Sequence, residues 1–180
     1  MREPYSAVTD EYELWECNDI DSSETEVIEL IGALVRATKP KLCVEVGTHI
    51  GLCSVAIGEA LERNGRGHLH CFELVPELAR EAEERTRSLP VTMHAVADVD
   101  YDPGRLGAPV DFLFVDGDLD NRDTSLAHWR PWLEPGAIVA VHDSLKREQI
   151  REAIDAIPHL QRIDIVTPRG LTLLKLAPAG

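Results

Sequence analysis

The sequence predicts an α/β protein built around a mostly parallel sheet, and two observations carry this prediction. Short apolar runs alternate along the chain with segments whose apolar residues recur at helical spacing. The first of these runs leads into a glycine turn, residues 45–51, which comes directly before a helical pattern. Because crossover helices join parallel strands, this alternation favours one sheet with helices on both faces.

The elements follow in chain order. A helix is expected from Ser23, which forms a capping box with Glu26, until Lys39-Pro40 stops it. Later helices are predicted at 51–63, 76–87 and 122–133, and Ser144 is expected to cap a further one. Strands are predicted at 42–44, 68–74, 91–96, 110–116 and 137–142, and the last two, 163–166 and 171–176, are expected to pair as an antiparallel hairpin. Pro135-Gly136 is predicted to turn the chain into strand 137–142.

Composition limits the class of protein. The 180 residues are 44% apolar and 28% charged, which is typical of one globular domain. A net charge of −14 would repel a phosphate backbone, so no nucleic-acid partner is expected. The four cysteines show no metal-binding spacing and are predicted to be reduced. Because the chain shows no apolar signal region and no stretch long enough to span a membrane, we expect a cytoplasmic protein without membrane association.

The glycine turn is the first candidate binding site. A nicotinamide dinucleotide fingerprint would need glycines at positions 47, 49 and 52, but His49 and Leu52 stand at the last two. The turn instead has the spacing Gly-x-x-x-Gly, Gly47 and Gly51, preceded by the carboxylate of Glu45. This pattern resembles motif I of the class I S-adenosylmethionine-dependent methyltransferases.

The resemblance extends beyond the turn. Polar residues follow nearly every predicted strand, where ligands of open α/β sheets bind; these are Glu45, Glu73, Asp98, Asp116, His142 and Asp143. The order of elements over residues 23–180 resembles the Rossmann-like class I methyltransferase fold, a seven-stranded, mostly parallel sheet with a C-terminal antiparallel hairpin. This resemblance implies S-adenosylmethionine as cofactor, bound by Glu45, Gly47, Thr48, Gly51, Glu73, Asp98 and Asp116.

Two of these residues have more specific expected contacts. Glu73 lies where an acidic side chain can accept both ribose hydroxyl hydrogens. Asp98 is expected by family resemblance near the adenine amino group, or, since it belongs to the run Asp98, Asp100, Asp102, in a solvated acidic loop.

The segments after the fourth and fifth of these strands resemble two groups of small O-methyltransferases, the catechol-type enzymes and the antibiotic-biosynthesis enzymes that modify cephalosporins and macrolide sugars. In the catechol-type pattern, Asp116 and Asp143 match two ligands of a divalent cation such as Mg²⁺, and Asp118 could add a third oxygen. Asp118 could equally serve only to open the following helix. Ser144 replaces the usual asparagine ligand, and Leu119 replaces the usual lysine or histidine base.

Without a cation, His142 or Asp143 would accept the proton of the acceptor hydroxyl, so the expected catalytic residues are Asp116, His142 and Asp143.

Residues 1–22 are expected to form an arm that packs on the core, closes over the acceptor or joins a partner in a homodimer, because they carry Tyr5, Tyr12 and Trp15. The predicted function is methyl transfer to a hydroxyl of a small molecule, in secondary metabolism. The alternatives are a methyltransferase-like protein that binds the cofactor or a nucleoside without catalysis, and a nicotinamide oxidoreductase.

Overall fold

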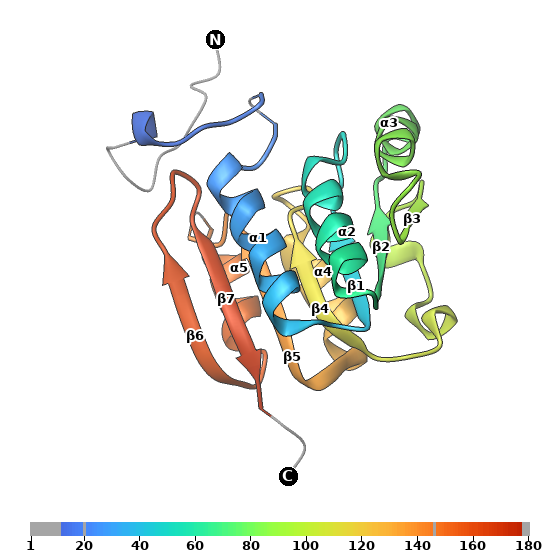
Figure 1. Cartoon of the computed structure of the whole chain (residues 1–180). Coiled ribbons are helices and arrows are strands. Elements are labelled where there is room, and N and C mark those ends of the chain that lie inside the picture. Colours follow the sequence, from blue (N-terminus) through green and yellow to red (C-terminus); the bar gives the residue numbers. More distant parts are fainter. Residues whose placement is uncertain (1–11, 20, 146, 178–180) are drawn as a thin grey trace.

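Figure 1 shows the computed structural model, which describes residues 12–19, 21–145 and 147–177. The helices are α1 (Thr25–Thr38), α2 (Leu52–Asn64), α3 (Pro76–Thr86), α4 (Arg122–Trp129) and α5 (Glu148–Asp155). The strands are β1 (Leu42–Val46), β2 (His68–Phe72), β3 (Val91–His94), β4 (Val110–Val115), β5 (Leu133–His142), β6 (His159–Ile165) and β7 (Leu171–Leu176). None of the helices in the described part of the chain is long and apolar enough to cross a membrane.

The strands form one seven-stranded sheet in the order β3-β2-β1-β4-β5-β7-β6. The first five strands pair in parallel, whereas β7 pairs antiparallel with both β5 and β6. The predicted mostly parallel sheet with a C-terminal antiparallel hairpin is therefore confirmed. Because the order reverses at β1 and β4, the loops after these two neighbouring strands open a crevice at the carboxyl edge of the sheet.

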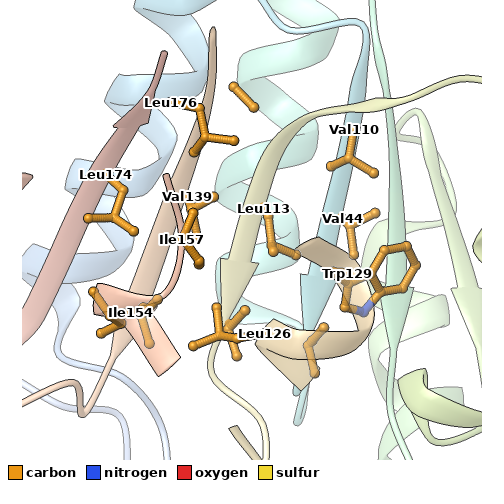
Figure 2. Close-up of a cluster of buried hydrophobic side chains, with 14 of the residues drawn as sticks. Val44, Val110, Leu113, Leu126, Trp129, Val139, Ile154, Ile157, Leu174 and Leu176 are labelled. Atoms are coloured by element: carbon orange, nitrogen blue, oxygen red, sulfur yellow. The ribbon is translucent and has the colours of Figure 1, made fainter. Parts of the chain in front are cut away.

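Two layers of helices cover the sheet, with α1 and α2 on one face and α4 and α5 on the other (Figure 1). Figure 2 shows the core under α4 and α5, where Val44 and Leu113 of the sheet pack with Trp129 and Ile154. Side chains alternate across a strand, so Cys43 belongs to the opposite core, under α1 and α2. By the same alternation Glu45 lies on the α2 face of the sheet.

Three local expectations are wrong. Helix α1 begins at Thr25 with Glu24 as its N-cap and without a side-chain cap, and the Ser23 hydroxyl donates to Asp116 instead of accepting from a helix amide. Ser144 does not cap α5, which begins at Glu148, because Ser144 is buried and its hydroxyl accepts from Thr172. Pro135-Gly136 is not a turn before the strand but lies inside β5, where the pairing with β4 shifts register.

Candidate functional site

A cavity of about 560 Å³ lies at the carboxyl ends of β1, β2 and β4, within the size range of small-molecule sites. It adjoins a small hollow of about 40 Å³ behind the turn that follows β1. Among the predicted cofactor-binding residues, Gly47, Glu73, Asp98 and Asp116 line the cavity, and Glu45, Gly47, Thr48 and Asp116 line the hollow. Gly51 lines neither space, because it is the N-cap of α2.

The glycine turn is held by the protein's own acceptors. The amides of Gly47 and Thr48 donate to the Phe72 carbonyl, at 3.0 and 3.3 Å, and Gly51 donates to Thr48. These amides are therefore engaged within the protein and are not left as donors to a ligand. Gly47 has φ 82°, and a Cβ atom there would collide with the Gly117 backbone after β4. Glycine at 47 thus lets the loops after β1 and β4 approach closely.

Glu73 is buried at the end of β2 and braces the glycine turn. Its Oε2 accepts the His49 amide at 2.8 Å, and its Oε1 accepts the Val75 amide at 2.9 Å. A carboxylate has about four lone-pair sites, so two remain for a ligand in the cavity. The predicted contact of Glu73 with ribose hydroxyls fits this position but stays a prediction.

Asp98 is not part of a solvated acidic loop. It is buried, and its two oxygens accept hydrogen bonds from Ser125 Oγ at 3.1 Å and from Trp129 Nε1 at 3.0 Å. Asp98 therefore anchors α4 to the loop after β3 while it also lines the cavity. The expected contact with adenine stays a prediction, because both oxygens already have partners.

Glu45 is buried beneath the turn. Its Oε2 accepts hydrogen bonds from Ser54 Oγ and from Cys71 Sγ, the latter at 3.2 Å, whereas no partner contacts Oε1 within the described residues. Burial raises the pKa of Glu45 to about 7. Nδ1 of His49 is the other buried side-chain atom without a partner in this part of the structure, and both residues line the small hollow. The hollow thus offers unsatisfied polar groups to a ligand.

His142, at the end of β5, is fully buried between two carboxylates. Its Nδ1 lies 2.8 Å from Asp116 Oδ1 and its Nε2 lies 2.6 Å from Glu24 Oε2. Burial lowers the pKa of His142, but the charge of Asp116 and the two hydrogen bonds outweigh it and raise this pKa to about 9. His142 is therefore an imidazolium that donates from both nitrogens, and neither is left to accept a proton from a substrate. The expected role of His142 as the base stays a prediction, which this geometry does not favour.

Arg122, at the start of α4, bridges the two predicted metal ligands. Its Nη2 donates to Asp116 Oδ1 at 2.8 Å, and its Nη1 donates to Asp143 Oδ2 at 2.7 Å. Its Nε donates to the Gly117 carbonyl at 2.9 Å, and Nη1 also donates to the carbonyl of His142. Four of the five guanidinium N–H groups are thus bonded within a buried site.

Acidic and basic side chains alternate in this cluster. Three carboxylates, Glu24, Asp116 and Asp143, face three cationic groups, which are His142, Arg122 and Arg169. Although burial raises the pKa of Asp116, the charges of His142 and Arg122 lower it to about 2. Ligand atoms of Asp116, His142 and Asp143 lie within 4.8 Å of one another, as a metal site would need. The guanidinium of Arg122, which already bonds both carboxylates, does not fit such a site.

The structure therefore brings the three predicted catalytic residues together but gives them unequal access. Asp116 lines both the cavity and the hollow, whereas Asp143 and His142 line neither. Asp143 also has a positive φ of 53°, a strained conformation that the bond to Arg122 helps to hold. Sequence patterns did not reveal Glu24, Arg122 and Arg169. Glu24 bonds His142 and the Arg169 amide, which are 118 and 145 positions away, whereas Arg122 lies only six residues after Asp116, and this spacing was the one available signal.

Comparisons with known proteins identify the family and the fold. Residues 44–144, more than half of the chain, match the family model of a methyltransferase domain. A search of curated protein sequences finds no significant match.

Several solved structures share the fold. TomG from Streptomyces achromogenes, an O-methyltransferase involved in tomaymycin synthesis and solved with S-adenosylmethionine, is 21% identical, with 87% of this chain and 82% of that chain covered and a TM-score of 0.70. An O-methyltransferase from Bacillus cereus, in complex with S-adenosylhomocysteine, is 16% identical, with 87% and 83% covered and a TM-score of 0.74. A putative caffeoyl-CoA O-methyltransferase from Staphylococcus aureus is 14% identical, with 92% and 87% covered and a TM-score of 0.73.

Proposed function

Because this chain belongs to the methyltransferase-domain family, we propose that it transfers the methyl group of S-adenosylmethionine to a hydroxyl group of a small molecule. The predicted membership of the S-adenosylmethionine-dependent methyltransferases is confirmed. The hydroxyl as acceptor is supported by the neighbours named above, which are O-methyltransferases. A role in secondary metabolism is supported by the part that TomG plays in tomaymycin synthesis.

One observation carries the assignment of the cofactor site. The small hollow, where Glu45 Oε1 and His49 Nδ1 lack partners among the described residues, opens beside the larger cavity that reaches Glu73. A ligand with a cationic ammonium group at one end and a ribose at the other satisfies both ends at once. The cofactor supplies a methyl group on a sulfonium, which an acceptor oxygen displaces in line.

We assign distinct tasks to the chain's own residues. Glu73 accepts hydrogen bonds from the ribose hydroxyls with the lone pairs that His49 and Val75 leave free. Glu45 and Asp116, which both line the hollow, face the ammonium group. Asp116 also faces the acceptor, since it lines both spaces, while His142 and Asp143 act as positioning residues behind it.

The low pKa of Asp116 bears on the acceptor. A carboxylate with a pKa of about 2 accepts a proton weakly, and His142 donates from both nitrogens. The site therefore suits an acceptor hydroxyl that ionises readily, such as a phenol, better than an aliphatic alcohol. This preference narrows the substrate class to be tried first.

The experiment that tests the function measures the release of S-adenosylhomocysteine from the purified protein with panels of phenols and aliphatic alcohols. Release with a phenol, and methylation of its oxygen by mass spectrometry, is the expected result. Calorimetry with S-adenosylmethionine and with NAD checks the cofactor separately. Binding of NAD in preference to S-adenosylmethionine would contradict the proposal.

A second candidate function is cofactor binding without transfer. It is favoured by Leu119, which stands where related groups carry a base, and by the bonding of both nitrogens of His142. Tight cofactor binding with no turnover on any acceptor of the panel would favour it.

The arm and the homodimer remain proposals. Residues 1–11 of the arm lie outside the described residues, but Asp21 lines both the cavity and the hollow, which supports an arm that covers the acceptor. The exposed side chains of Leu160 and Ile163 on the edge strand β6 support a contact with a second copy. Sedimentation of the purified protein measures the oligomeric state.

A further inference from the structure

We propose that the guanidinium of Arg122 takes the place of a divalent cation in this site, so that the Asp116–Asp143 pair binds no metal ion. The inference deepens the proposed function, since it concerns the same carboxylates, but it is a statement about binding that does not depend on turnover. It contradicts the assignment of Asp116 and Asp143 as metal ligands.

Arg122 occupies the position that a shared cation would take. A cation shared by two carboxylates lies between them, and Nη2 and Nη1 of Arg122 lie 2.8 Å from Asp116 Oδ1 and 2.7 Å from Asp143 Oδ2. The Arg122 side chain is only 5% exposed, so the guanidinium is enclosed with its partners. A divalent ion would have to displace a group that already makes four hydrogen bonds.

Two further lone-pair sites of Asp116 are engaged, which leaves about one of its four on Oδ2. Its Oδ1 accepts from His142 Nδ1 at 2.8 Å, and its Oδ2 accepts from Ser23 Oγ. A hard cation such as Mg²⁺ needs near-octahedral oxygen ligands at short distances. Asp118 is not one of the residues whose ligand atoms come together here, and its oxygens accept from the Asp120 amide and from Asn121 Nδ2.

Replacement of a cation by Arg122 has a consequence for recognition. A bound cation would hold two neighbouring oxygens of an acceptor directly. The guanidinium of Arg122 turns four of its five N–H groups toward the protein, so it positions Asp116 and Asp143 and does not chelate an acceptor. Acceptors with a single hydroxyl are therefore expected to serve as well as those with vicinal hydroxyls.

Manganese binding to the full-length protein tests the inference, because Mn²⁺ occupies magnesium sites and is seen by electron paramagnetic resonance. We expect no stoichiometric Mn²⁺ binding by the wild-type chain and one bound ion per chain in Arg122→Ala, where the guanidinium is gone. In the double variant Arg122→Ala/Asp143→Asn the acquired affinity should fall by at least about tenfold. Arg85→Ala, which removes an exposed arginine of α3, is the control and should bind no ion.

The measurement on the wild-type chain shows whether the native site binds Mn²⁺, and it can be made even if Arg122→Ala does not fold. One Mn²⁺ bound by the wild-type chain and lost in Asp143→Asn would overturn the inference. A folded Arg122→Ala that gains no affinity would also overturn it, because the guanidinium would then not be filling a cation's place. Calorimetry with S-adenosylmethionine on the same samples, with and without a chelator, reports separately on the proposed function. If the protein failed to bind the cofactor, the proposed function would be contradicted, but the Mn²⁺ result could still be interpreted by itself.

Discussion

The imidazole of His142 and the carboxylate of Glu24 lie 2.6 Å apart, although the two residues are separated by 118 positions in the chain. Glu24 is the N-cap of α1, and His142 is the last residue of strand β5. The contact therefore ties the start of the domain to the edge of the sheet where the candidate site lies. Both side chains are fully buried. If one of them were removed, water could not replace the hydrogen bond that the other would lose.

The His142–Glu24 pair makes the free energy of unfolding depend on pH in the neutral to alkaline range. A histidine in an unfolded chain titrates near pH 6.5, whereas the pKa of His142 in the folded protein is about 9. Its stabilising contribution is therefore complete below about pH 6.5 and is lost as the pH rises through 9. The free energy of unfolding, measured with urea across this range, should fall by up to about 3 kcal/mol, since a difference of one between the folded and unfolded pKa values corresponds to about 1.4 kcal/mol.

The variant Glu24→Gln isolates this effect. It removes one of the carboxylates that hold the proton on His142 and so lowers the folded pKa, and the alkaline loss of stability should be smaller and end at a lower pH than in the wild-type chain. His128→Gln, which changes a histidine outside the cluster, should leave the profile unchanged. Identical profiles for Glu24→Gln and the wild type would contradict the assigned protonation state of His142.

A second prediction concerns Asp116. Asp116→Asn leaves Arg122 and His142 without a full counter-charge in a buried site, so we expect a loss of about 3–5 kcal/mol in the free energy of unfolding. Asp118→Asn, in the same loop but exposed, should change stability by no more than about 0.5 kcal/mol. Urea titrations of the two variants give the comparison, and equal effects would show that the cluster is not a buried ion network.

A third prediction concerns the cofactor. Glu73→Ala removes the acceptor proposed for the ribose hydroxyls, and a bond to a charged group is worth about 1.5–3 kcal/mol, so affinity for S-adenosylmethionine should fall at least tenfold. Glu77→Ala on the exposed side of α3 is the control. Calorimetry measures both. Because Glu73 also braces the His49 amide, the thermal midpoint of each variant is needed beside the affinity.

A fourth prediction concerns the arm. Removing residues 1–15 spares the Glu16–Thr25 and Cys17–Glu24 contacts, so the core should remain folded. If the arm covers the acceptor, the truncated protein should have a higher KM for the acceptor in turnover assays. Its affinity for the cofactor should be unchanged. Unaltered turnover, sedimentation and stability would show that these residues have none of the proposed roles.

Local patterns predicted the order of strands and helices, and also the cavity, because the carboxyl ends of parallel strands share one edge of a sheet. Gly47, Glu73 and Asp116 were placed in this way. The ion network could not be predicted from local patterns. Glu24 contacts His142, and Arg122 contacts Asp143, only after the chain has folded. Residues that bond across long sequence separations leave no periodic signal, and Ser23 illustrates the error that follows. Its spacing to Glu26 predicted a helix cap, but the hydroxyl bonds Asp116 instead.

The last prediction separates two reasons why glycine is found at position 47. Gly47 has φ 82° and Gly107 has φ 73°, so an alanine at either position adopts a left-handed conformation at similar cost, about 1 kcal/mol or more. A Cβ at 107 meets open space, whereas a Cβ at 47 collides with the backbone of Gly117, which no side-chain rotation can relieve. Gly47→Ala should therefore destabilise the protein by at least about 1 kcal/mol more than Gly107→Ala, the typical cost of forcing a packed site apart.

The same collision should act on binding. It would push the loops after β1 and β4 apart, and these loops carry Gly47 and Asp116, which line both the cavity and the hollow. Gly47→Ala should thus weaken S-adenosylmethionine binding in calorimetry, while Gly107→Ala, at a position that lines neither space, should bind as the wild type does. Equal stability and equal cofactor affinity in the two variants would mean that the close approach of Gly47 to Gly117 does not shape the site.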